Sequence, residues 1–214
     1  MNFGLQNLRS VLNDKKGFTL VEMAIVLIII GVIIGAVVKG KDLVRSAEQK
    51  KVYTKFANAW RLAYLNFYDR TGKVLGDFYN TTGAAAGQDG HADTTPNNGA
   101  VTEGELVDST NEGDYLGLLE VGLEAPVTNT ADSWVYRYID SAGIAHDLTI
   151  SFLFDTYNYM QIAAIPNELA MALDTMIDGE ANGTAGDFIG NATAGAAWGT
   201  TPTTDTTARW KMQF

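Results

Sequence analysis

An apolar run of 21 residues, Phe18 to Val38, constrains this chain more than any other feature of its sequence. It reads FTLVEMAIVLIIIGVIIGAVV and holds one charged residue, Glu22. As a helix rising about 1.5 Å per residue, the run spans roughly 31 Å, the thickness of a bilayer core. A removable secretory signal would have a shorter apolar centre followed by a small-residue cleavage site, and none follows Val38. The run therefore predicts a helix that stays in a membrane.

Glu22 is the exception inside this run, and its position is informative. An ionisable side chain in an apolar segment is costly in lipid, so it suggests a function by default. Its carboxylate calls for a cation, and a free amine created by cleavage beside Phe18 would supply one. The plainer alternative is an ordinary anchor for a soluble domain. A Lys15-Lys16-Gly17 segment directly before the run, with an acid one turn inside it, argues against that alternative.

The segment KKGFTLVE, residues 15–22, followed by the aliphatic run, resembles a known sequence motif. It is similar to the cleavage and methylation motif of type IV prepilins and type II secretion pseudopilins. The resemblance implies that a prepilin peptidase cuts between Gly17 and Phe18, removes the leader 1–17, and methylates the new amine of Phe18. It also implies that Glu22 neutralises the amine of a neighbouring subunit during assembly.

The same resemblance implies partners and a location. The partners are a prepilin peptidase, other pilins or pseudopilins, an inner-membrane platform protein and a cytoplasmic assembly ATPase. The protein would cross the inner membrane once, with its head outside the cytoplasm, in the periplasm or at the cell surface, and would enter a pilus or pseudopilus. Lys and Arg residues balance across the run, so the resemblance alone gives this orientation. Gly31 matches a glycine at which pilin helices often loosen, and Lys39 replaces a proline of many major pilins.

Charge is divided unevenly along the chain. Residues 39–73 hold nine Lys or Arg against three acids, whereas residues 74–214 hold three basic residues against twenty acids. Such an acidic head repels a phosphate backbone, so we expect no nucleic-acid partner. The chain has no cysteine, which excludes disulfides and thiolate chemistry.

The apolar pattern continues beyond Val38 as an amphipathic helix. Apolar side chains recur at three- and four-residue spacing, which predicts a single buried stripe; they are Tyr53, Phe56, Trp60, Tyr64 (or Ala63) and Phe67. Gly72 supplies the stop signal. We expect one helix over 18–70, with 18–38 in the membrane or filament core.

Residues 71–214 are predicted to form a small α+β head with antiparallel strands laid over the long helix. Residues 81–114 are typical of a surface loop. The elements expected after it are a short helix over 115–121, strands over 134–139 and 148–154, a helix over 167–177, and a closing edge strand over 209–214. A turn at Ser141–Gly143 joins the two strands, and Pro166 opens the second helix.

Catalytic motifs are absent from the sequence, so we expect no enzymatic activity. His146 is expected to be structural or exposed rather than a metal ligand. One acidic cluster follows the predicted helix, around Gly179. Asp174, Asp178 and Glu180 offer hard oxygen ligands that suit calcium. The alternative is that these acids cap and solvate the helix end.

The sequence therefore favours a non-enzymatic structural subunit of a type IV pilus-like filament. Two alternatives stay open. One is a type II secretion pseudopilin, which the lysine at position 39 favours together with a minor-pilin role. The other is a membrane-anchored binding protein or enzyme exported with a pilin-like leader.

Overall fold

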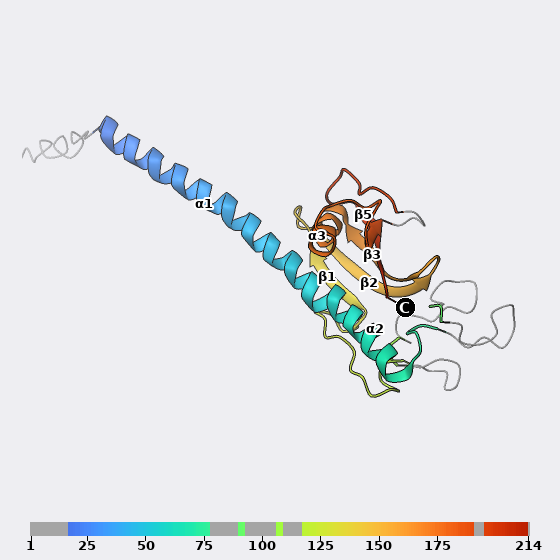
Figure 1. Cartoon of the computed structure of the whole chain (residues 1–214). Coiled ribbons are helices and arrows are strands. Elements are labelled where there is room, and N and C mark those ends of the chain that lie inside the picture. The colour runs from blue at the N-terminus through green and yellow to red at the C-terminus, as the bar shows by residue number, and fades with distance from the viewer. Residues whose placement is uncertain (1–16, 78–89, 93–105, 109–116, 191–194, 214) are drawn as a thin grey trace, which may run out of the picture. The chain divides into compact units, whose positions relative to one another are not determined.

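The computed structural model describes residues 17–77, 90–92, 106–108, 117–190 and 195–213 (Figure 1). The chain divides into two compact units, residues 1–44 and residues 45–214. The first unit is helical over its described part from Leu20 onward. The second unit, called the head below, holds the rest of the helix and all the strands. The predicted loop 81–114 lies mostly outside the described residues.

The long N-terminal helix forms as three consecutive segments. They are α1 (Leu20–Val52), a π-helical turn η1 (Tyr53–Ala57) and α2 (Asn58–Thr71), which confirms the helix predicted over 18–70. It ends at Gly72, whose left-handed φ of 69° lets its N–H donate to the Tyr68 carbonyl at 2.7 Å. The π-turn was not expected. Within it, the Thr54 hydroxyl donates back to the Lys50 carbonyl at 3.0 Å.

Five antiparallel strands form one sheet in the order β1-β2-β3-β5-β4. Their bounds are β1 (Val135–Ile139), β2 (Ala145–Phe154), β3 (Asn158–Pro166), β4 (Phe188–Gly190) and β5 (Asp205–Lys211). Helix α3 (Asn167–Ile177) follows β3 directly, and Pro166 occupies its N-cap as predicted. The predicted α+β class and the hairpin of β1 and β2 are therefore confirmed.

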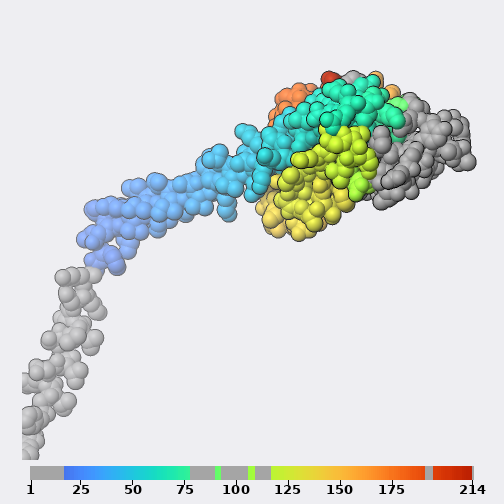
Figure 2. All heavy atoms as spheres, turned by 90° about the horizontal axis from the view of Figure 1, so that it is seen from below, coloured from blue at the N-terminus to red at the C-terminus, as the bar shows by residue number. Residues whose placement is uncertain are grey.

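The hydrophobic core lies between the helices and one face of the sheet. The predicted aromatic stripe faces it: Phe56 packs on Tyr136 at 5.4 Å between ring centroids, and Tyr64 stacks on Phe152 at 5.0 Å. Helix α3 adds apolar side chains such as Leu173 to the same core. Figure 2 shows the opposite side of the long helix, in cyan and teal, on the outside of the head.

Three sequence predictions for the head were incomplete or wrong. Strands β3 and β4 were not predicted. The strand expected at 209–214 is β5, which lies between β3 and β4 rather than at an edge. The short helix expected at 115–121 is a turn over its described part, because the N–H groups of Leu118 and Leu119 donate to Leu106 and Val107 instead.

Candidate functional site

The predicted cleavage point lies in an open segment ahead of the helix. Gly17, Phe18 and Thr19 have no regular secondary structure, and the Phe18 side chain is 79% exposed. No heavy atom would lie within 4 Å of a side chain placed at Gly17. Within the single chain the described side of this bond is therefore exposed. The basic pair Lys15-Lys16 lies outside the described residues.

Glu22 is held at the helix N-terminus by a reciprocal capping box with Thr19. The backbone N–H and the hydroxyl of Thr19 both donate to Glu22 Oε2 at 2.8 Å. The Glu22 N–H donates to Thr19 Oγ1 at 3.2 Å. These bonds satisfy free N–H groups of the first helical turn. Sequence reasoning missed the role of Thr19, although a Thr-x-x-Glu pattern before an apolar run is its known signature.

The capping box ties the Glu22 carboxylate to Thr19, the residue directly after Phe18. Cleavage after Gly17 would free the backbone nitrogen of Phe18 as an amine. The segment that follows is apolar around its whole circumference. Its large side chains are exposed within the single chain, the least being Met23 at 45% and the most Leu20 at 91%. By length and composition, one helix among the described residues can cross a membrane, and it contains this segment.

Comparison with known proteins agrees with this geometry. A family model described as the prokaryotic N-terminal methylation motif matches residues 12–38. The chain carries the N-terminal methylation motif of type IV pilin-like proteins. The motif implies processing by a prepilin peptidase and assembly with other pilins. No curated protein and no solved structure matches the chain.

Two of the three acids predicted to bind calcium have other contacts in the described part of the head. Asp174 Oδ2 accepts from Trp198 Nε1 at 2.6 Å, Asp178 Oδ2 accepts from the Phe188 N–H at 2.9 Å, and Glu180 is exposed. Among the described residues, no group of three acidic or histidine side chains is placed to hold a metal ion. Asp178 instead ties the end of α3 to β4. Calcium binding by this cluster stays a prediction from sequence.

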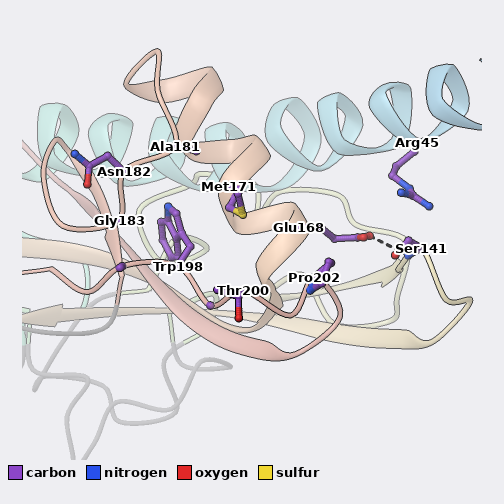
Figure 3. A pocket seen from close by; sticks show the side chains of 12 residues that line it. Arg45, Ser141, Glu168, Met171, Ala181, Asn182, Gly183, Trp198, Thr200 and Pro202 are labelled. Carbon is purple, nitrogen blue, oxygen red and sulfur yellow. Dashed lines mark hydrogen bonds between the residues drawn. The ribbon is translucent and has the colours of Figure 1, made fainter.

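Asp174 is fully buried, and its hydrogen bond holds the indole ring of Trp198 in place. Burial raises the pKa of Asp174, the Trp198 hydrogen bond lowers it, and the Asp178 charge raises it further, so that the net pKa is raised. Trp198 lines a groove of about 650 Å³ that also takes in Met171 and Glu168 of α3 (Figure 3). Asn167 ties the segment that follows Trp198 to the start of α3: its side chain accepts from the Gly199 N–H at 3.1 Å and donates to the Thr201 carbonyl at 2.8 Å.

A buried histidine cluster ties the β1–β2 hairpin to β5. His146 Nε2 lies 3.0 Å from Asp140 Oδ2, and Nδ1 lies 2.6 Å from Asp205 Oδ1. Only 6% of the His146 side chain and none of the Asp140 side chain is exposed. Asp140 also accepts from the N–H groups of Ala142 and Ile144, both at 2.8 Å, and so closes the hairpin turn. The expectation that His146 is structural agrees with this geometry.

Proposed function

We propose that this chain is a non-enzymatic structural subunit of a type IV pilus-like filament. It is made with a leader, inserted in the inner membrane, cut after Gly17 and methylated at Phe18. It then enters a filament by packing residues 18–38 against the same segment of its neighbours. In this account the head carries no reaction; it forms the surface of the filament.

The observation that carries the proposal is the fully apolar helix with one acid at its start. An apolar segment of this length needs lipid or other helices around it, because water is unfavourable at every face. When lipid is exchanged for neighbouring helices, Glu22 loses access to water at the membrane surface. The Phe18 amine of a neighbour then offers the opposite charge at the same depth. The same pair would align adjacent subunits.

A type II secretion pseudopilin is the second candidate, and position 39 favours it. Many major pilins have a proline there, and this chain has Lys39 within the helix α1. Proline removes a helical hydrogen bond and kinks a helix, whereas lysine allows the helix to continue. A short secretion fibre or a minor-pilin position in a longer pilus would both suit such a subunit.

The proposal includes the cellular partners that a filament of this kind needs. A membrane platform protein would receive the processed subunit, and a cytoplasmic ATPase would drive its extraction from the bilayer. The leader would lie in the cytoplasm and the acidic head outside it. Deletion of either partner should leave cleaved subunits in the membrane.

Processing gives the first test. We expect the mature protein to begin at Phe18 and to carry one N-methyl group, because Gly17–Phe18 is the bond that the motif presents. Intact-mass and N-terminal peptide mass spectrometry of membrane-extracted protein measures this. A matched control is Gly17→Ala, which leaves residues 18–214 unchanged and should reduce cleavage. A mature chain that begins at Met1 or after Val38 would contradict the proposal.

A further inference from the structure

The basic side chains of the head fall into two sets. One set contacts groups of the head itself, through ion pairs, carbonyl oxygens or aromatic rings; its members are Arg61, Arg70, Arg137, Arg209 and Lys211. The other set includes Lys50, Lys51 and Lys55 on the long helix, here called the lysine row. All three are exposed, and none forms an ion pair or a side-chain hydrogen bond with the described residues.

The lysine row lies on a helix whose opposite side is already occupied. Val52, Phe56 and Trp60 turn toward the sheet, with at most 1% of each exposed. The three lysines are exposed outside this buried stripe, and Lys51 also borders a small pocket beside β1. Lys50 and Lys51 lie in the last turn of α1 and Lys55 lies in the π-turn η1, so all three share one short stretch of the long helix.

The lysine row is cationic, whereas residues 74–214 of the head have a large excess of acidic side chains. Residues 74–214 hold twenty acids against three basic residues. Several of these acids are exposed and without a partner among the described residues: Glu124, Asp132, Glu180 and Asp187. Identical acidic heads packed side by side repel one another. A filament of such heads needs a cationic surface on each subunit at the contact between them.

Lipid headgroups suit the lysine row less well. Lys50 follows the end of the apolar run, Val38, by 12 residues, which is about 18 Å of helix. The headgroup layer on each side of a bilayer is only about 5–7 Å thick. A protein surface is therefore the better partner for these three side chains than an anionic membrane.

We propose that Lys50, Lys51 and Lys55 bind the acidic head of a second copy of this chain. The inference rests on the proposed filament, and it adds a second, electrostatic contact outside the apolar core. Glu22 and the Phe18 amine align subunits within the membrane, whereas the lysine row and the head carboxylates hold them together outside it. Exposed charges across an interface mainly set register and partner choice.

Zero-length cross-linking tests the contact in the full chain. Filaments are grown from a mixture of ¹⁴N- and ¹⁵N-labelled subunits and treated with a carbodiimide, which joins a lysine amine to a carboxylate that touches it. We expect mixed-isotope peptides that contain Lys50, Lys51 or Lys55 joined to an acid from 74–214. Cross-links from these lysines only within one isotope, or none, would overturn the proposal.

Charge reversal gives the second measurement. The triple variant Lys50→Glu, Lys51→Glu, Lys55→Glu should still be inserted and cleaved, because the changes are exposed and far from Gly17. Its share of filaments formed with wild-type subunits should fall about tenfold or more, since like charges then meet at the interface. Lys55→Glu alone should also be reduced, and Lys73→Glu, a single exposed reversal past the helix end, is its matched control and should be incorporated normally.

The outcomes separate this inference from the proposed function. Normal incorporation of the triple variant would overturn the lysine-row contact and leave the filament intact. A wild-type chain that forms no filament with any pilin would instead contradict the proposed function, and the contact with it. Exclusion of Lys73→Glu to the same extent as Lys55→Glu would show that net charge alone is sensed, which also overturns a defined contact.

Discussion

His146 carries the clearest electrostatic consequence among single residues. Burial lowers the pKa of its imidazole, but the hydrogen bonds and charges of Asp140 and Asp205 outweigh that effect and raise the pKa above its ordinary value. With an acceptor at each ring nitrogen, both nitrogens donate when the ring is protonated. Burial raises the pKa of Asp140, yet its bonds to His146, Ile144 and Ala142 lower it overall.

The pH dependence of head stability follows from these two shifts. The His146 contribution is complete below its unfolded pKa of about 6.5 and is lost as pH rises through the raised folded value. The Asp140 contribution is present above its unfolded pKa of about 3.9 and is lost as pH falls through the lowered folded value. We expect the melting temperature to fall as pH rises from 6.5 through the folded pKa of His146.

An NMR titration of the imidazole signals measures the His146 pKa directly, and His91 is the only other histidine in the chain. Asp205→Asn keeps an acceptor but removes the charge, so it should move the His146 titration to lower pH. His146→Gln should flatten the thermal profile in this range. A His146 pKa at or below 6.5 in the wild-type protein would contradict the arrangement.

At the scale of elements, the loop between α3 and β4 depends on a close approach at Gly186. Its φ is +104°, and a Cβ there would overlap the Asp178 carboxylate that accepts from the Phe188 N–H. Gly143, in the hairpin turn, has a similar φ of +85° with nothing within 4 Å of a Cβ. The two positions share the backbone strain of an alanine substitution and differ in the steric clash.

Gly186→Ala should therefore destabilise the head more than Gly143→Ala. Strain at a left-handed position costs about 1–3 kcal/mol in both variants. Gly186→Ala adds displacement of Asp178 and loss of its hydrogen bond, about 1 kcal/mol more. Urea denaturation of both variants measures the difference. Equal loss in the two would show that Asp178 does not hold the loop.

The elements differ in how well the sequence predicts them. Helix α3 and the long helix carry strong 3.6-residue patterns with stop and start signals at Gly72 and Pro166, and both were predicted. Strand β3 was missed because its sequence NYMQIAAIP does not alternate regularly: consecutive alanines follow Ile162, where the register with β5 shifts. Strand β4 is only three residues long, within a glycine-rich stretch. No local pattern marks such a strand.

The same contrast holds for the site residues. Gly17, Phe18 and Glu22 lie within one short segment, and a local motif is enough to find them. His146 and Asp205 are 59 residues apart and meet only because the hairpin of β1 and β2 and the strand β5 belong to one sheet. The calcium prediction came from spacing along the chain, whereas the fold directs Asp174 to Trp198 and Asp178 to Phe188. Such contacts between residues distant in sequence can be predicted only when the topology of the sheet is known.

The whole molecule combines an apolar helix with a head whose exposed sheet face carries both charged and apolar side chains. Arg137 and Asp147, opposite each other on β1 and β2, form an ion pair on that face. The aromatic stripe of the helix is buried in the core of the head. The apolar surface of 18–38 is exposed in the single chain. We propose that this N-terminal segment, with Glu22 as its only charged side chain, forms the apolar core of the assembly contact, to which the lysine row adds an electrostatic contact outside the membrane.

We propose that the charge of Glu22, rather than its place in the capping box, drives assembly. Glu22→Gln keeps a side chain that can accept from the Thr19 N–H, so the helix start is preserved. Glu22→Ala removes both the capping contact and the charge. Neither change touches the bond after Gly17, so leader removal and membrane insertion should be normal in both variants.

The most direct test is to express each variant with wild-type subunits, confirm its cleaved mass, and count it in purified filaments. We expect Glu22→Gln and Glu22→Ala both to be excluded, because each leaves the Phe18 amine of a neighbour unpaired in a dry interface. Glu22→Asp, which keeps the charge, should be incorporated better than either. Incorporation of Glu22→Gln at the wild-type level would contradict the account, since assembly would then proceed without the carboxylate charge.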